Sequence, residues 1–481
     1  MRHFPKSFFL ALGFLLGLTG MAAGQPAPGQ PWSLQECIDQ ALKNNLQIRQ
    51  SGFLADRARV DRIQARENLL PTVNGNASQT YNFGTSVDPF TNIFTEERIR
   101  SNNFSLFANV NVFSGLQLQN NMKRTALEYE ASLSDLEGAK NNLILDVITS
   151  YVQILFADEL EEMNRLQLAS TTQQADRTQK LFRAGAVPES NVLEISAQIA
   201  TDELNIINAQ NQKEIARLRL VQLLNLQQVR DFQIVKPEVP NPANEVIAFD
   251  ALEVYNAAQQ RMPEIKSADL RVLSAMKGID VSKGAYYPTL SVGAGVFTGY
   301  SNQRPRFTLG EGFRREFLGF VDEQGTQPFY VYRPAFVSGE YGFADQIRDN
   351  LGRQVNATLR IPILNGLQLR NNVTRARIAL DNAQVSAELV RNQLRQVIEQ
   401  AYTDALAAQK RFEATSRQVE ALQLSYRNAE TRLNSGVMNV TDFNVALNNF
   451  RRAQSDLIQA RYDYVFKLKV LDFYQGNPLT F

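Results

Sequence analysis

The sequence predicts an α+β membrane protein in which four β-strands of membrane-crossing length are joined to unusually long helices. This prediction follows from three features of the chain. It contains an internal duplication, each copy has two strands of alternating polarity, and each copy has a helical stretch far longer than a compact domain requires.

The charge balance gives little indication of a charged partner. The 481 residues include 50 Lys and Arg against 49 Asp and Glu. A protein that binds nucleic acid usually shows a basic excess or a basic stripe. We therefore do not predict nucleic acid as a partner.

Residues 1–24 have the organisation of a signal peptide. Arg2 and Lys6 make the beginning positive, residues 8–18 are apolar, and small residues at 22–24 precede a cleavage site. The apolar run is too short to cross a bilayer as a helix, so a membrane anchor is the weaker alternative. We predict export with removal of residues 1–24.

The exported chain has few residues suited to catalysis or metal binding. It contains no histidine after residue 24, and Cys37 is its single cysteine. Serine–histidine and cysteine–histidine catalysis, histidine metal sites and internal disulfides are thereby excluded. We predict no catalytic residue, no metal and no cofactor. A secreted enzyme that uses two carboxylates remains an alternative, although no paired-carboxylate motif stands out.

Comparison of the chain with itself shows two tandem copies. LLPTVNGNAS at 69–78 matches YYPTLSVGAG at 286–295, a shift of 217 residues. VFSGLQLQNN at 112–121 matches ILNGLQLRNN at 363–372, a shift of 251 residues. The second copy therefore carries 34 extra residues between the two motifs.

These matches set the expected domain organisation. The first repeat covers 25–226, the second covers 250–475, and a short tail follows at 476–481. A proline-containing linker at 227–249 separates the repeats. We expect this linker and the chain termini to form a small mixed equatorial region beside the helices.

Each repeat shows the same order of helical segments. A helix is predicted first, at 34–68 and 251–283, and ends before Pro71 or Pro288. A very long helix is predicted at 116–183 and 367–434, followed by another after a tip glycine. About 68 residues at about 1.5 Å each give roughly 100 Å of helix.

The strands lie between these helices, as a hairpin at 72–113 and a pair at 289–364. Phe104, Leu106 and Ala108 alternate with Asn and Ser, and the second repeat alternates in the same way to Ile363. A period of two with one apolar face is typical of a strand. A half-buried sheet in a soluble protein is the alternative. Strands of about ten residues, however, also cross a bilayer when they are tilted.

The number of strands implies more than one copy of the chain. An open sheet edge is not tolerated in lipid, because each unpaired backbone group costs several kcal/mol. Known membrane barrels have at least about eight strands, and one chain supplies four. Other copies must therefore close the barrel.

Signal peptide, duplication, strand pairs and glycine-broken helix tips together resemble the TolC-like outer-membrane efflux proteins. The resemblance covers the whole exported chain. It implies a homotrimer in the outer membrane, surrounded by its lipid, with a twelve-stranded barrel continued by a long periplasmic α-helical barrel. It also implies an exit duct of a tripartite efflux or type I secretion system, which docks with a periplasmic adaptor and an inner-membrane transporter.

The second tip, RLNSGVMNVTDF at 432–443, carries the most specific part of this resemblance. It implies that Asp442 belongs to an acidic ring that constricts the periplasmic entrance. A second aspartate, frequent in the family, is replaced here by Val445. In the first tip the equivalent positions hold Asn191 and Glu194, so the ring is expected from Asp442 and Glu194. The alternative role of Asp442 is a favourable charge at a helix N-terminus.

The remaining candidate residues concern the turns and the lumen. Gly185 and Gly436 are expected to reverse the chain between antiparallel helices and to meet the adaptor. Leu181 and Leu433 are expected to pack either inside the tips or against that partner. Arg360, on the polar face of a strand, is a candidate lumen residue that affects anion passage.

Two questions stay open from the sequence. The long segment at 301–352 is either a plug or lid over the outer mouth or a solvated loop. The rival class for the whole chain is a periplasmic adaptor or another structural coiled coil of the envelope, although no strict heptad is sustained. The cargo is not indicated by any motif.

Overall fold

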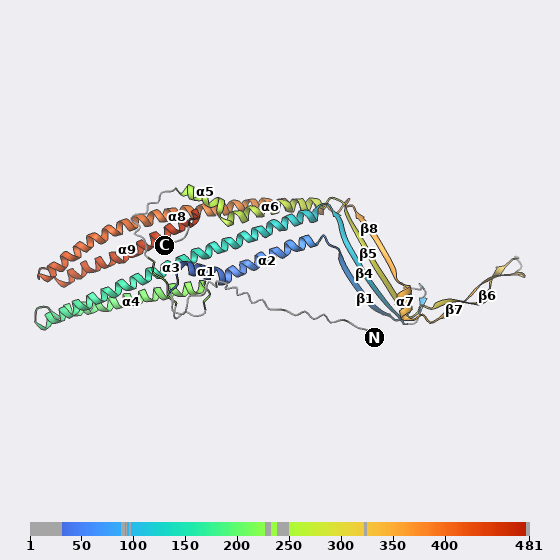
Figure 1. Cartoon of the computed structure of the whole chain (residues 1–481), viewed down its shortest axis with the longest axis horizontal. Helices are drawn as coiled ribbons and strands as arrows, with labels where there is room; N and C mark the ends of the chain where they lie inside the picture. The colour runs from blue at the N-terminus through green and yellow to red at the C-terminus, as the bar shows by residue number, and fades with distance from the viewer. Residues whose placement is uncertain are drawn as a thin grey trace, which may run out of the picture. The chain divides into compact units, whose positions relative to one another are not determined.

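The computed structural model describes residues 31–87, 92, 94–95, 98–226, 232–237, 250–321 and 325–477 (Figure 1). The predicted signal peptide lies outside these residues. Most of the linker at 227–249 and residues 478–481 of the tail also lie outside them.

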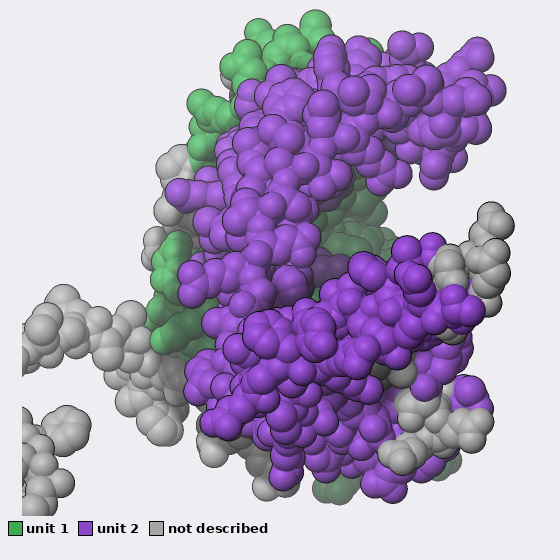
Figure 2. All heavy atoms as spheres, turned by 90° about the vertical axis from the view of Figure 1, so that its right-hand side faces the viewer, with its two compact units in different colours: residues 1–53, 134–265, 390–481 green, residues 54–133, 266–389 purple. Residues whose placement is uncertain are grey.

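The chain divides into two compact units, which are coloured separately in Figure 2. Unit 1 comprises Met1–Phe53, Ser134–Ile265 and Val390–Phe481, and unit 2 comprises Leu54–Leu133 and Lys266–Leu389. Each unit draws residues from both sequence repeats. The compact units therefore do not coincide with the repeats.

The two longest helices occur at equivalent places in the repeats. Helix α3 (Gln117–Arg183) and helix α8 (Gln368–Asn434) each contain 67 residues. Neither has a proline in its interior, and helix-forming residues dominate both. At about 1.5 Å per residue, each spans roughly 100 Å. Within the described residues, no helix combines the length and the hydropathy needed to cross a membrane.

Two helices predicted as single segments are each divided into two. The first becomes α1 (Leu34–Asn44) and α2 (Leu46–Glu67), because the Asn45 side chain accepts the backbone N–H of Gln47 at 2.8 Å and restarts the helix. The second becomes α5 (Ala251–Arg261) and α6 (Pro263–Gly284). A proline at the first position of α6 has no N–H to donate and fits a helix start.

A four-stranded antiparallel sheet lies in unit 2, in the order β1-β4-β5-β8 (Figure 1). Its strands are β1 (Thr72–Asn82), β4 (Ile99–Ser114), β5 (Thr289–Ser301) and β8 (Gly352–Arg360). The central pair, β4 and β5, joins the first repeat to the second. Strands β1 and β8 are therefore the two edges.

Strand β8 ends at Arg360, earlier than the alternation at 355–363 predicted. Pro362 has no backbone N–H and cannot donate a hydrogen bond in the ladder, which accounts for the early end.

The long segment of the second repeat is not an irregular loop. It forms an antiparallel ribbon of β6 (Arg306–Phe320) and β7 (Pro328–Gly339), followed by the short helix α7 (Phe343–Asp349). A smaller pair, β2 (Ser86–Val87) and β3 (Phe94–Thr95), lies between β1 and β4. The ribbon was not predicted, because bulges between Leu309 and Phe313 interrupt the alternation of polar and apolar residues.

The largest core of unit 1 gathers residues far apart in the sequence. Trp32 forms a parallel bridge with Ile234, and its N–H donates to the Gln233 carbonyl at 2.8 Å. The Tyr151 hydroxyl donates to the Val235 carbonyl at 2.6 Å. Cys37 is fully buried in this core, and burial raises the pKa of its thiol to about 12. The described part of the linker thus packs beside the residues that precede α1.

Candidate functional site: the helix tips

The first helix tip lies between α3 and α4 (Glu189–Leu223) in unit 1. The Gly185 N–H donates to the Phe182 carbonyl at 2.9 Å, and the Ala186 N–H donates to the Leu181 carbonyl at 2.9 Å. This is the Schellman pattern, in which the last carbonyls of a helix are satisfied by the turn that follows.

The second tip, between α8 and α9 (Val440–Gln475), repeats this pattern around Gly436. The φ angles of Gly185 and Gly436 are +70° and +72°, in the left-handed region. A Cβ atom added at either place would meet no atom of a non-adjacent residue within 4 Å. The backbone conformation, and not space, is therefore the reason for glycine at both tips.

Asp442 lies in the first turn of α9 and is exposed. The Asn439 side chain accepts the Asp442 backbone N–H at 2.7 Å and donates to the Asp442 carboxylate at 2.9 Å. The carboxylate is thus held at the positive end of the helix, where a negative charge is favourable. The structure supports the capping geometry and also leaves the carboxylate accessible to solvent.

The structure brings the two acidic candidates to neighbouring places. The Thr441 hydroxyl donates to the Glu194 carboxylate at 3.3 Å, and Thr441 precedes Asp442. Glu194 is exposed, whereas Asn191 is half-buried with its backbone N–H donated to the Pro188 carbonyl at 3.2 Å. The two tips of one chain therefore meet through Glu194 and the start of α9.

The two candidate leucines have different environments. Leu433 is half-buried and packs against a small core of Ala429, Phe443 and Leu447 within the second tip. Leu181 is exposed at the first tip. Leu433 therefore packs inside its own tip, and Leu181 is the one of the pair that is open to a partner.

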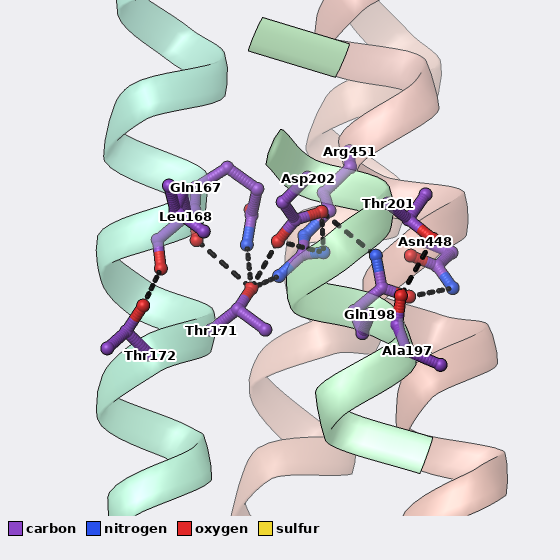
Figure 3. Close-up of polar contacts among 10 residues, drawn as sticks. All are labelled: Gln167, Leu168, Thr171, Thr172, Ala197, Gln198, Thr201, Asp202, Asn448 and Arg451. Atoms are coloured by element: carbon purple, nitrogen blue, oxygen red, sulfur yellow. Dashed lines mark hydrogen bonds and ion pairs between the residues drawn. The ribbon is translucent and has the colours of Figure 1, made fainter. Parts of the chain in front are cut away.

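A buried polar cluster, which was not predicted from the sequence, links α9 to α3 and α4, the two helices of the first tip (Figure 3). Arg451 of α9 lies with Nη1 3.3 Å from Asp202 Oδ1 of α4, and 10% and 3% of these side chains are exposed. Arg451 Nη2 also donates to the Thr171 hydroxyl of α3 at 2.9 Å. Gln198 donates to Asp202 at 2.9 Å. We call Arg451, Asp202 and Thr171 the buried latch.

Burial dominates the electrostatics of the latch. It lowers the pKa of Arg451 to about 10, although the nearby Asp202 charge acts in the opposite direction. The guanidinium remains charged at neutral pH, and its Nε has no acceptor within the described part of the chain. Such a pair is costly to break, because either partner alone would be a buried, uncompensated charge.

The sequence does contain a signal for this latch. At the shift of 251 residues, Arg451 corresponds to Ala200, and Asp202 corresponds to Ala453. At each of these two positions, one repeat has a charged residue where the other has alanine, and the positions lie on α4 and α9. The signal was not usable, because the sequence does not show which faces of these helices touch.

A second ionic cluster lies elsewhere in unit 1, around Glu161 of α3. Burial alone would raise the pKa of its carboxyl. Hydrogen bonds from Gln210, Arg165 and Lys213 together have the larger effect and lower this pKa to about 2. Lys213 also pairs with Asp158 at 2.5 Å. The cluster joins α3 to α4, and its Glu161 carboxylate is charged at neutral pH.

Arg360 lies at the end of an edge strand of the sheet. Arg360 is the last residue of β8, is exposed, and pairs with Thr289 of β5. Among the described residues, no group of three or more His, Cys, Asp or Glu side chains is arranged to hold a metal ion.

Comparisons with known proteins agree with this architecture. TolC, an outer membrane protein of Escherichia coli, is 22% identical over 467 residues, which cover 94% of this chain and 84% of TolC. The crystal structure of the outer membrane protein VceC from Vibrio cholerae matches with a TM-score of 0.72 at 14% identity, covering 93% of this chain and 97% of VceC.

A shorter similarity links the chain to an uncharacterized protein of Haemophilus influenzae. The two are 24% identical over 263 residues, which cover 55% of this chain and 56% of that protein. The family described as outer membrane efflux protein matches residues 37–226 and 337–477. These segments make up more than half of the sequence, and the chain therefore belongs to the outer membrane efflux protein family, whose channels reside in the outer membrane.

Proposed function

We propose that three copies of this chain form an outer-membrane exit duct of a tripartite efflux or type I secretion system. Passage through the duct is passive, without catalytic activity of its own. A periplasmic adaptor and an inner-membrane transporter supply cargo and energy. Family membership supports this function over the rival of a periplasmic adaptor.

The observation that carries the assembly is the open sheet of unit 2. Both edge strands, β1 and β8, lack a partner on one side within the described chain. The internal β4–β5 pair supplies a template for their pairing, because β4 corresponds to β8 and β5 corresponds to β1 between the repeats. Pairing β8 with β1 of the next copy satisfies the backbone groups that lipid cannot hydrogen-bond.

The gate of the duct is proposed at the helix tips. Copies of Asp442 and Glu194 around one axis concentrate negative charge, which attracts cations and makes a narrow opening selective. The buried latch ties α9 to α3 and α4, so that separating these helices requires breaking its ion pair. Opening is then driven by partners that stabilise the separated helices.

The test is extraction of the full protein from outer membranes with detergent. A particle of three chains that forms ion-conducting pores in planar bilayers is expected. A monomeric particle without conductance would contradict the proposal.

A further inference from the structure

The β6–β7 ribbon of unit 2 has one face of exposed, mostly aromatic side chains. Residues paired across antiparallel strands share a face, and here the pairs Leu309 with Phe336 and Phe313 with Pro334 follow one another. We call this the apolar ribbon face, and its most exposed apolar members are Phe307, Leu309, Phe313, Tyr332 and Phe336, each between 62% and 73% exposed. Arg315, paired with Tyr332, lies on the same face, with its guanidinium over the Tyr330 ring.

The opposite face of the ribbon has a different composition. Arg333 Nε lies 3.1 Å from Glu316 Oε2, and Thr308 and Arg314 lie on the same face. The apolar residues of this face include Phe329, Val331 and Val337. The ribbon is therefore two-sided, and an isolated two-stranded hairpin is only marginally stable in water. A contiguous exposed apolar surface of this kind marks an interaction site.

The base of the ribbon is firmly held within unit 2. Gln346 of α7 is fully buried, its amide accepts the Ser301 N–H at 3.0 Å, and it donates to the Ser301 carbonyl at 2.9 Å. The Thr298 hydroxyl donates to the Ile347 carbonyl at 2.6 Å. The ribbon thus leaves the end of the sheet from a fixed root (Figure 1).

We propose that the apolar ribbon face packs against the same face of neighbouring copies of this chain, over the outer mouth of the channel. The inference rests on the proposed multichain assembly. The ribbon connects β5 to β8, the edge strand that pairs with the next copy, so an identical ribbon emerges beside it. In a closed symmetric assembly these identical faces are presented to one axis at high effective concentration.

The charge of the ribbon favours a second copy over an anionic lipid surface. Residues 306–339 contain four arginines and four acidic residues, so the segment is formally neutral. Neighbouring ribbons therefore carry no net like charge, and the ribbon lacks the basic excess that binds anionic headgroups.

Disulfide formation in isolated outer membranes tests the contact. Leu309→Cys places a thiol on the apolar ribbon face, and Thr308→Cys, one residue earlier, is a matched control on the opposite face. Cys37 can remain, because its burial and raised pKa keep its thiol unreactive. After mild oxidation, Leu309→Cys is expected to give disulfide-linked dimers in several-fold higher yield than Thr308→Cys.

Other outcomes distinguish this inference from the assembly itself. An intact oligomer on native gels with equal or no cross-linking would overturn the ribbon contact alone. If the Leu309→Cys thiol reacted with a membrane-impermeant maleimide only after detergent was added, without cross-linking, the apolar ribbon face would lie in lipid. This result would also contradict the contact between ribbons. If the Leu309→Cys thiol reacted with the maleimide as fast as the Thr308→Cys thiol, the apolar ribbon face would be exposed to water, and the proposed contact would be wrong. A monomer would overturn the proposed assembly first, and this inference with it.

Discussion

Arg451 of α9 and Asp202 of α4 form an ion pair between the two repeats, with 3.3 Å separating Nη1 and Oδ1. Both side chains are almost completely buried, and the corresponding positions of the other repeat hold alanine. The pair therefore belongs to one place in the tip region and is not repeated by the duplication. It is a buried polar link between α4 and α9, whereas the Glu194–Thr441 and Gln198–Asn448 contacts of the same helices are exposed.

Arg451→Met is expected to destabilise the protein by about 3–5 kcal/mol, because it leaves Asp202 buried without its partner. It is also expected to raise the open probability of the channel. Thermal unfolding and bilayer conductance measure these effects. Arg452→Met, at the exposed neighbouring position, is the matched control and should change neither.

A compensating variant separates the ion pair from general disruption. In Arg451→Met/Asp202→Leu both charges are absent, so most of the lost stability should return. Failure of the double variant to recover would show that the loss does not come from an unpaired charge.

Asp442→Asn is expected to reduce cation selectivity while keeping the helix start intact, because the new amide oxygen can still accept from Asn439. Asn439→Ala should do the reverse, with a loss of about 1 kcal/mol of stability and unchanged selectivity. Reversal potentials in a salt gradient and thermal unfolding measure the two properties. If Asp442→Asn leaves selectivity unchanged, the carboxylate is a capping group and not part of the gate.

The lowered pKa of Glu161 predicts that the stability of the protein depends on pH. Its pKa in the folded protein is about 2, below the ordinary value of 4.5, so its contribution is present above pH 4.5 and is lost as the pH falls towards 2. The stability difference between wild type and Glu161→Gln should shrink over that range in thermal unfolding. The exposed Glu203→Gln is the control, and a gap that stays constant down to pH 2 would argue against the hydrogen-bonded carboxylate.

Gly436→Ala is expected to cost about 1–2 kcal/mol, because φ is +72° and the alanine side chain strains the left-handed backbone. Gly436→Asn should cost less, since asparagine tolerates this conformation. The same change in a helix, Gly52→Ala in α2, has free space around it and should be stabilising by up to about 1 kcal/mol. Chemical denaturation would measure the free energy of unfolding, which should fall in Gly436→Ala and rise in Gly52→Ala. Equal changes in both variants would contradict the role of the positive φ angle.

The pairing between copies can be tested at single residues. Ser105 pairs with Phe297 in the β4–β5 ladder, and the repeat shifts of 251 and 217 convert this pair into Asn356 and Thr80. Asn356→Cys with Thr80→Cys should therefore cross-link neighbouring chains. Asn356→Cys with Asn76→Cys, displaced by roughly 13 Å along the strand, should not, and efficient cross-linking of that pair would contradict the proposed register.

The sequence alone determined the features that depend on local patterns. The alternation at Phe104, Leu106 and Ala108 predicted a strand, and β4 contains these residues. Long proline-free stretches predicted α3 and α8, and a glycine at each tip predicted the reversal, since only glycine adopts a positive φ without cost. Comparison of the repeats also placed Asn191 at the position equivalent to Asp442, and Glu194 at the position equivalent to Val445.

Only the tertiary structure decided which of these surfaces meet. Arg451 and Asp202 are 249 residues apart, and their pairing depends on the faces that α4 and α9 turn to each other, which side-chain spacing does not specify. The strand order β1-β4-β5-β8, with its two open edges, likewise arises from backbone hydrogen bonds between the repeats. Local preferences set the elements, whereas burial of charge and pairing of backbone groups over long separations set the contacts on which gating and assembly depend.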